Sequence, residues 1–294
     1  MKSFRALRAL VLFSLLAPRG AALIAQTEKP VAPDALSTGS SLSLFGEDPS
    51  RALSITGFGV GSYAYNFNTD TNSFEPSVLA VAFSRVISDR LSAFAQLTVS
   101  REAASPFLAD EGSSTDVSTD IDNLQLTWVP SAVSGLLITF GKFDSPLAIE
   151  RDDPPLNFQA TNSFTFVFAR PVKFVGVQVH ESFSEHFEGW VILTNGWDVD
   201  SDNNKAKTVA LYGLWNPSLA AHVGLGVIQG AEKDNSTGDP RTTGVLTLLF
   251  QPAATWVLGG ELVAGQEPHS APDGGTAAWY AGMAFTHHRF GDHV

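Results

Sequence analysis

The 294-residue sequence contains no cysteine, few cations and little charge of either sign. The absence of cysteine excludes a disulfide scaffold, a thiolate zinc site and a cysteine nucleophile. Only 18 Lys and Arg residues stand against 30 Asp and Glu residues, and phosphate repels a chain of net charge −12 that lacks a basic stripe. We therefore expect no nucleic-acid partner. Charged residues make up 16% of the chain, while 25 Gly and 21 Phe residues are present, a composition that excludes a disordered chain.

The N-terminus has the pattern of a secretory signal peptide. Basic residues precede an apolar stretch at 9–16, and small residues follow, among them Ala25. We predict a signal peptide over residues 1–26, with cleavage after Ala25, and a flexible leader over 27–50. Beyond this segment no apolar run reaches the roughly 18 residues of a transmembrane helix, so any membrane domain must be built from strands.

From residue 51 to the end of the chain, segments of about ten residues alternate between apolar and polar side chains, which is the pattern of β-strands. Leu124, Leu126 and Trp128, for example, alternate with Asn123, Gln125 and Thr127. Twelve strands are predicted, at 53–67, 76–87, 91–102, 119–129, 136–143, 172–182, 187–196, 206–215, 219–230, 242–250, 255–265 and 276–288.

The connections between these segments alternate in length along the chain. Short links such as 88–90 and 216–218 are followed by long polar ones such as 103–118 and 144–171. A soluble sandwich gives no reason for this alternation, whereas an outer-membrane barrel has short periplasmic turns and long extracellular loops. The pattern predicts an all-β fold over residues 51–294, an antiparallel transmembrane β-barrel of about 12 strands, with 12–16 possible and both termini in the periplasm.

Aromatic residues near the predicted strand ends indicate an interfacial girdle. Three of them come one or two residues before a proline of a short turn, at the height where a barrel meets the membrane surface. The alternative is a set of ordinary aromatic residues in the core of a sandwich. The girdle candidates are Trp128, Trp197, Trp215, Phe250 and Trp279.

Two blocks of sequence resemble a known family. The first runs Gly141-Lys142-Phe143-Asp144-Ser145-Pro146-Leu147 and continues at Ala169-Arg170-Pro171; the second contains Thr194-Asn195-Gly196-Trp197-Asp198 and Asp202-Asn203-Asn204-Lys205. Together they resemble the putative β-barrel porin-2 family, OmpL-like outer-membrane porins of Gram-negative bacteria. The resemblance covers residues 120–260 well and the remainder only in pattern.

The sequence departs from the family pattern at two places. Ala148 and Glu150, with Ile149 between them, replace the Gly and Glu that often follow the proline, and the last residues, His-His-Arg-Phe-Gly-Asp-His-Val, lack a terminal aromatic residue. The family also tends to be longer, so the pattern is compatible with a C-terminally truncated chain. The resemblance implies a bacterial outer-membrane location, lipid contact, and a water-filled channel for small hydrophilic solutes or ions, with a homo-oligomer possible and no cofactor.

The longest predicted loop, 144–171, follows the fifth predicted strand, where general porins have their constriction loop. Its acidic residues would form a negative ring that favours cations, and nearby basic residues would set a transverse field. The alternative is a charged loop that is solvated outside the pore. The constriction candidates are Lys142, Glu150, Arg151, Asp152, Asp153, Arg170 and Lys173.

Polar residues within the predicted strands should point into the lumen, because a carboxylate on the lipid face is expensive. The lumen candidates are Gln125, Gln178, His180, Glu188, His222 and Glu261.

The sequence gives only weak indications of a metal site or of catalysis. Asp198, Asp200 and Asp202 have the spacing of a calcium loop but lack its later glycine and acid, so we expect no metal site. No catalytic set can be identified, so we expect no enzyme, and the alternatives are a plugged barrel whose loops bind a ligand and, less favoured, a barrel hydrolase.

Overall fold

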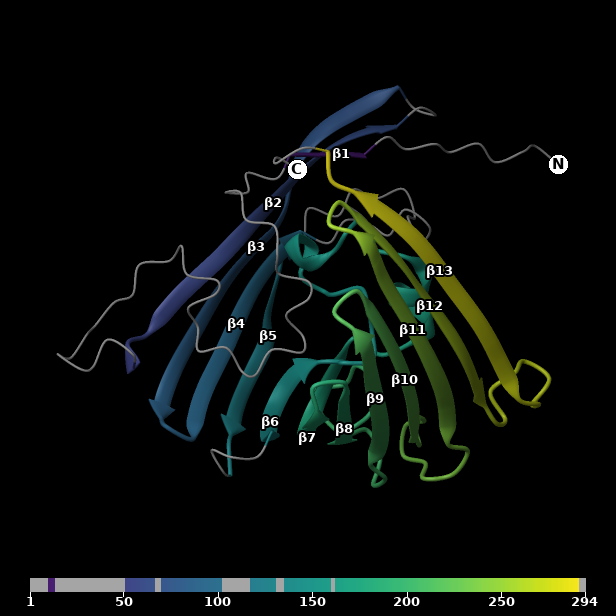
Figure 1. Cartoon of the computed structure of the whole chain (residues 1–294). Coiled ribbons are helices and arrows are strands. Elements are labelled where there is room, and N and C mark those ends of the chain that lie inside the picture. Colours follow the sequence, from purple (N-terminus) through teal and green to yellow (C-terminus); the bar gives the residue numbers. More distant parts are fainter. Residues whose placement is uncertain are drawn as a thin grey trace. The chain divides into compact units, whose positions relative to one another are not determined.

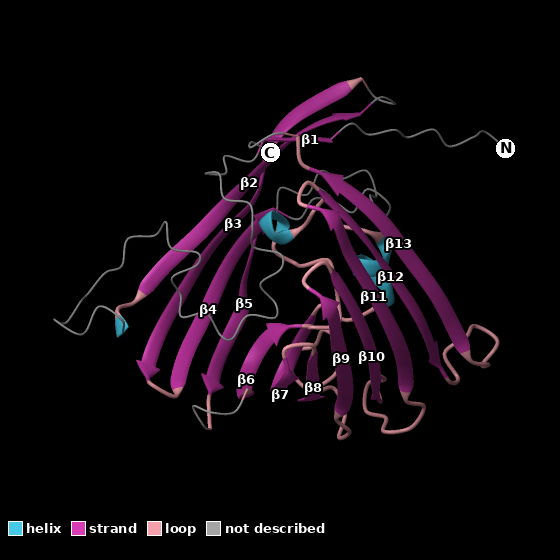
Figure 2. Ribbon diagram, viewed as in Figure 1, coloured by secondary structure: helices cyan, strands magenta, loops and turns pink. Residues whose placement is uncertain are grey.

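The fold is a single antiparallel β-sheet in which the strands follow one another in chain order (Figure 1; Figure 2). The computed structural model describes residues 10–13, 51–66, 70–101, 117–130, 135–159 and 162–290. Thirteen strands occur there, and β2 to β13 correspond one to one with the twelve predicted strands. The prediction of an all-β fold with twelve antiparallel strands is confirmed. The strands are β1 (Leu10–Phe13), β2 (Ser54–Asn66), β3 (Thr71–Ser88), β4 (Leu91–Arg101), β5 (Val117–Trp128), β6 (Leu136–Asp144), β7 (Lys173–Ser184), β8 (Phe187–Thr194), β9 (Thr208–Ser218), β10 (Ala221–Gly230), β11 (Arg241–Ala253), β12 (Trp256–Glu267) and β13 (Ala277–His288).

Two strands differ from the sequence-based expectation. The short β1 lies inside the predicted signal peptide and pairs with β2, so removal of that peptide would leave β2 to β13. Strand β3 begins at Thr71, five residues before the start predicted at Pro76. Pro76 lies within the strand, opposite Gly61, where the register shifts. A bulge tolerates the missing N–H of proline, which a regular ladder does not. The predicted leader at 27–50 lies outside the described residues.

From β3 onward, the connections follow the predicted alternation of lengths, whereas the connection after β2, predicted to be long, has only the four residues 67–70. The turns after β3, β7, β9 and β11 each contain two residues, whereas the connections after β6, β8, β10 and β12 are much longer. The connection after β6 carries two short helices, a 3₁₀ turn η3 (Pro154–Leu156) and a π-helical turn η4 (Thr165–Ala169).

The chain forms two compact units. Among the described residues, the first unit comprises those within 10–13, 51–85 and 94–122, and the second comprises those within 86–93 and from 123 onward. In the first unit, Gln96 Nε2 donates a hydrogen bond of 2.8 Å to Asp122 Oδ2, and both side chains are buried. The second unit contains the whole of β6 to β13 and all the contacts described below.

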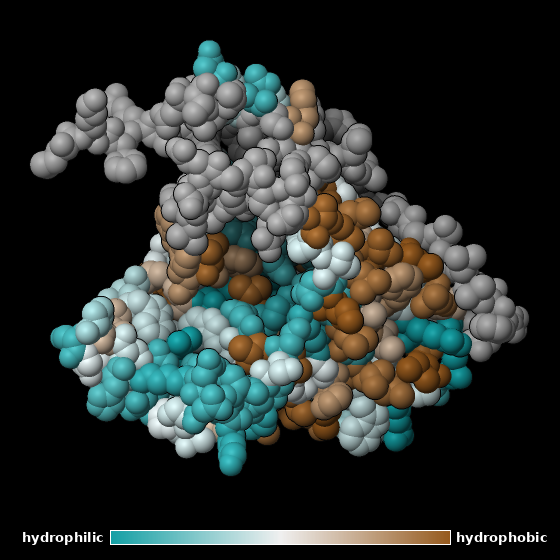
Figure 3. Space-filling model, turned by 180° about the vertical axis from the view of Figure 1, so that it is seen from behind, coloured by the Kyte–Doolittle hydropathy of each residue, from teal (hydrophilic) through white to brown (hydrophobic). Residues whose placement is uncertain are grey.

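Within the second unit the sheet has two chemically different faces. Gln178, Ile192, Ala210, Ile228 and Thr243 are successive register partners from β7 to β11, and all but half-buried Gln178 are buried. We call this side the covered face. The opposite side, the apolar face, exposes large hydrophobic residues, and broad hydrophobic areas are visible in Figure 3. Residues of the apolar face include Leu124, Val191, Leu193, Leu211, Leu225, Val227, Leu248, Leu262 and Tyr280.

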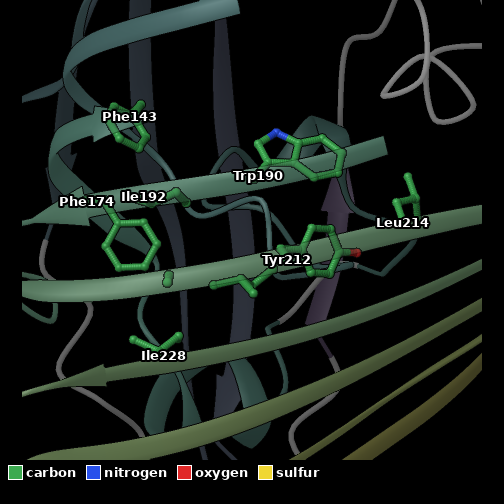
Figure 4. Packing of buried hydrophobic residues seen from close by; sticks show 9 residues of the cluster. Phe143, Phe174, Trp190, Ile192, Tyr212, Leu214 and Ile228 are labelled. Carbon is green, nitrogen blue, oxygen red and sulfur yellow. The ribbon is translucent and has the colours of Figure 1, made fainter. Parts of the chain in front are cut away.

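A cluster of aromatic and aliphatic side chains forms the core on the covered face (Figure 4). Trp190 and Tyr212 pack with ring centroids 5.2 Å apart, next to Ile192. Leu147 joins this cluster from the connection after β6 and is completely buried. It lies so close to β10 that a Cβ atom on Gly226 would be 2.0 Å from Leu147 Cδ2. The glycine therefore allows the connection to pack directly on the strand.

Replacement of Leu147 by Ala should destabilise the folded chain. Leu147 is 0% exposed, so the change leaves a cavity, which typically costs about 2–5 kcal/mol. The free energy of unfolding, measured by urea titration in lipid vesicles, tests this. Leu219→Ala is the control, because Leu219 is 88% exposed, and a cost equal to that of Leu147→Ala would contradict the packing described.

Candidate functional site

The connection between β6 and β7, residues 145–172, folds against the covered face, and we call it the inner loop. Its turn η4 packs on β12 and β13, where Trp279 Nε1 donates a hydrogen bond of 3.1 Å to the carbonyl of Ala169. Earlier in the loop, before η4, Phe158 stacks on Phe285 of β13 at 5.0 Å between ring centroids. The longest connection is thus held along the sheet and is not merely solvated.

A buried ion pair joins the inner loop to β12. Arg170 Nε donates to Glu261 Oε1 at 2.6 Å, and both side chains are 1% exposed. The backbone N–H of Ile149 donates to the other oxygen, Oε2, at 3.0 Å. Glu261, predicted to face the lumen, therefore lies on the covered face and is fully engaged by the loop.

Glu150 has a role within the loop. Its carboxylate is buried and accepts hydrogen bonds from Gln159 Nε2 at 2.5 Å and from the backbone N–H and hydroxyl of Ser163. These contacts join the first part of the inner loop to its middle and later parts. The oxygens of Glu150, predicted to line a constriction, are engaged in the folding of the loop.

The three charged residues after Glu150 have different surroundings. Arg151 donates from Nη1 to the carbonyl of Ser145 at 3.4 Å, and burial lowers the pKa of its guanidinium. Asp152 is exposed and lies 3.4 Å from Lys173 Nζ, while Asp153 is half-buried just before η3. Asp152 is therefore the acid of this run that is most open to solvent.

The two predicted lysines lie at the ends of strands and form ion pairs. Lys173 Nζ is 2.5 Å from Asp144 Oδ1. Lys142 is the register partner of Leu124, a residue of the apolar face, and its Nζ is 3.1 Å from Asp200. Lys142, predicted as a constriction residue, thus alternates with buried Phe143 and lies on the same side of the sheet as Leu124.

Polar residues of four strands meet on the covered face near the two-residue turns. His180 Nε2 lies 3.0 Å from Glu188 Oε2, Asn216 Nδ2 donates to Glu188 Oε1 at 3.3 Å, and His222 Nδ1 lies 2.7 Å from Asn216 Oδ1. Three predicted lumen residues are thus brought together. Asn216 was missed, although its alternation with Trp215 could have placed it. Gln125 and Gln178 are half-buried and are not linked to this network by any described hydrogen bond.

The aromatic candidates fall into two groups. Trp128, Trp215 and Phe250 are exposed on the apolar face, where a girdle would require them. Trp197 and Trp279 instead pack edge to face at 6.2 Å, with the guanidinium of Arg241 4.9 Å from the Trp197 ring. Trp279 lies on the covered face, and its neighbour Tyr280 is exposed on the apolar face.

The three aspartates with calcium-loop spacing do not converge. Asp198 accepts hydrogen bonds from the backbone N–H groups of Val172 and Lys173, and burial raises its pKa against the effect of these bonds. Asp200 pairs with Lys142, and Asp202 pairs with Lys207. Within the described part of the chain, no group of three or more His, Cys, Asp or Glu residues is placed to hold a metal ion.

The long connections are linked to one another in series. Asp198, between β8 and β9, binds the end of the inner loop as described above. Glu232, between β10 and β11, accepts from Trp197 N at 2.8 Å. Lys233 then donates to the carbonyl of Pro268, between β12 and β13, at 2.9 Å. Each loop is therefore positioned by the next one along the sheet.

Comparison with known proteins identifies this architecture. Residues 53–294 match the family described as "Putative beta-barrel porin-2, OmpL-like". The chain belongs to this OmpL-like porin family. Among solved structures, the outer membrane channel DcaP of Acinetobacter baumannii is similar in fold, with a TM-score of 0.51 and 11% sequence identity over 83% of this chain and 76% of that one. No curated protein matches the sequence significantly.

Membership of the OmpL-like porins places the chain in the outer membrane and makes it a β-barrel channel protein of a family that is typically non-enzymatic. Among the described residues, no helix is long and apolar enough to cross a membrane. The apolar face then has a physical explanation, because the outward side of an outer-membrane strand contacts lipid.

An arginine at the centre of the apolar face should oppose insertion. Leu225, in the middle of β10, is 66% exposed, and Leu225→Arg should reduce the folding free energy in bilayers by about 2–4 kcal/mol. Reversible folding into lipid vesicles measures this. Leu219→Arg, in the two-residue turn after β9, should cost about 0–1 kcal/mol. Equal costs at both positions would show that Leu225 does not face lipid.

Acid should loosen the connection between β10 and β11. His269 and Lys233 hold the pKa of Asp239 below its ordinary value of 3.8. The resulting stabilisation is present above pH 3.8 and is lost as the pH falls through the lowered pKa of the folded state. A spin label on Thr237→Cys, in a chain without other cysteines, should become more mobile below pH 3.8. In Asp239→Asn the label should be mobile throughout, and a persistent pH response there would assign the change to another group.

Proposed function

We propose that the protein is a passive diffusion channel for small hydrophilic solutes or ions, with a preference for cations. The observation that carries this proposal is the position of the inner loop, which lies against the covered face in a chain whose family consists of porins. A loop that lies against the inside of a barrel narrows the aqueous pore without blocking it. The channel needs no cofactor.

The charge of the long connections supports the cation preference. The connections at 145–172, 195–207, 231–240 and 268–276 together contain ten acidic and five basic residues. The charges of Arg170 and Glu261 compensate each other within the protein. Exposed carboxylates such as Asp152 act over the greatest distance, because charges in a narrow pore lined by protein attract counter-ions.

Replacement of Asp152 and Asp153 by Asn should reduce cation selectivity. A negative unit charge about 6 Å from a permeating ion stabilises a cation by about 0.7 kcal/mol in water and destabilises an anion by the same amount, so the cation-to-anion permeability ratio should fall by roughly tenfold per charge removed. The reversal potential in a planar bilayer under a salt gradient measures this ratio.

The matched control is Asp89→Asn with Glu185→Gln, which removes two charges from the two-residue turns at the other ends of the strands. This control should change the reversal potential less than the Asp152 and Asp153 variant does. Identical reversal potentials in the wild type and in the Asp152 and Asp153 variant would show that the inner loop does not line the ion pathway.

A plugged barrel whose loops bind a ligand is the second candidate. The packing of Leu147 among Trp190, Ile192 and Tyr212 favours it, because this part of the covered face is filled by side chains. A folded protein that shows no discrete conductance steps would support this candidate over the channel.

A further inference from the structure

We infer that Glu261 is a positioning residue: this single carboxylate on β12 holds both ends of the inner loop against the sheet and thereby sets the width of the channel. The inference rests on the proposed channel function. It concerns the mechanical role of one buried residue, whereas the cation preference depends on exposed acids.

The first argument is geometric. The two oxygens of Glu261 bind opposite ends of the inner loop, Ile149 N at 3.0 Å and Arg170 Nε at 2.6 Å. These two residues lie 112 and 91 positions away from Glu261 in sequence. One side chain therefore brings together the beginning of the loop, its end and a distant strand.

The second argument concerns the guanidinium of Arg170. Its Nη2 donates to the carbonyl of Glu150 at 3.2 Å, its Nη1 donates to the carbonyl of Pro171 at 3.3 Å, and its Cζ lies 5.0 Å from the centre of the Phe166 ring. These contacts all belong to the inner loop. In the described structure, the acid paired with Arg170 is Glu261, which belongs to strand β12 and not to the loop.

Removal of the charge on Glu261 would leave a buried cation without its paired anion. The loss of one partner from a buried pair is strongly destabilising, because the remaining charge stays out of water. The loop can relieve this by moving away from the wall until Arg170 is hydrated. The neighbouring contacts, such as Trp279 with Ala169, are neutral and do not compensate the charge.

In the wild type, the ion pair of Arg170 and Glu261 contributes to the position of the loop and little to ion selectivity. Arg170 and Glu261 are each 1% exposed and have opposite charges, so together they add little to the field in the pore. In Glu261→Gln the cation of Arg170 remains without its anion, so release of the loop should raise conductance and lower the ratio of cation to anion permeability together. In the double variant Arg170→Met with Glu261→Gln, which removes both charges, that ratio should stay close to the wild-type value.

Thiol labelling tests the position of the loop independently of conductance. The chain has no cysteine, so Ala148→Cys, at a buried position next to Ile149, introduces a unique thiol. In the background of the wild-type glutamate, a charged water-soluble maleimide should react slowly. With Glu261→Gln, the reaction should be roughly 100-fold faster, in line with the loss of a buried pair.

The matched control is Glu267→Gln. Glu267 is a buried acid on the same strand, and its Oε2 lies 3.1 Å from Arg241 Nη2, outside the inner loop. This variant should leave the labelling rate of Ala148→Cys unchanged. Equal acceleration in both variants would overturn the inference, because it would show general loosening of the barrel.

A second comparison tests whether the uncompensated charge releases the loop. In the double variant Arg170→Met with Glu261→Gln, no buried cation remains, so labelling should return to within about tenfold of the wild-type rate. Labelling as fast as in Glu261→Gln alone would contradict this role of the charge. If Glu261→Gln fails to fold, Glu261→Asp retains the charge, shortens the side chain, and should give an intermediate rate.

Single-channel conductance completes the test. In Glu261→Gln, the expected result is faster labelling, larger conductance steps and a reversal potential shifted toward lower cation selectivity, because Arg170 is left without its anion. Faster labelling with unchanged conductance would overturn the role of Glu261 in setting the channel width. A third outcome is that labelling is faster in Glu261→Gln but neither the wild type nor the variant conducts ions although both are folded. That result would contradict the proposed channel function, while the role of Glu261 in positioning the loop would still hold.

Discussion

The structure depends on one constraint, the need to pair every backbone N–H and C=O group in a medium without water. Strands in an outer membrane meet this need through continuous ladders to their neighbours. Once neighbouring strands are in register, alternate side chains must lie on opposite faces. Ile192, Ala210 and Ile228 are aligned across three strands on the covered face for this reason, and Val191, Leu211 and Val227 lie on the apolar face.

The same constraint determines where buried acids occur and what they bind. A carboxylate on a spanning strand is driven to the covered face, and there it needs a partner because it is shielded from water. Glu188 is within hydrogen-bonding distance of His180, Glu267 pairs with Arg241, and Glu261 pairs with Arg170. Only in the last pair does the partner come from a long connection. The other two pairs join residues of adjacent strands, so they stabilise the wall, whereas Glu261 joins the wall to the loop.

Alternation made the strands and the two faces predictable from the sequence, and it could have settled more of the site. Trp279 and Tyr280 are adjacent aromatic residues, and hydropathy alone does not decide which one points outward. Lys142 was grouped with the inner loop because it is close to the loop in sequence. Its alternation with buried Phe143 instead indicated the apolar face. The contact of Arg170 with Glu261 was not predictable, because it depends on how a connection with little regular structure folds across a strand that is 91 residues away. The contacts of Glu150 were not predictable either, because they depend on how the same connection folds on itself.

The inner loop contains two kinds of charge that act over different distances. Glu150 and Arg170 are buried, and their hydrogen bonds determine how the loop folds and where it lies. Asp152 is exposed, and its field extends into solvent over roughly a Debye length, about 8 Å at physiological ionic strength. Arg170 is paired with Glu261, and the carboxylate of Glu150 is held by hydrogen bonds within the loop, so substitutions at the exposed positions can alter the field around the loop without moving it. In the proposed channel, substitution of the exposed acids would therefore change the preference between ions while the position of the loop, and with it the channel width, stays the same.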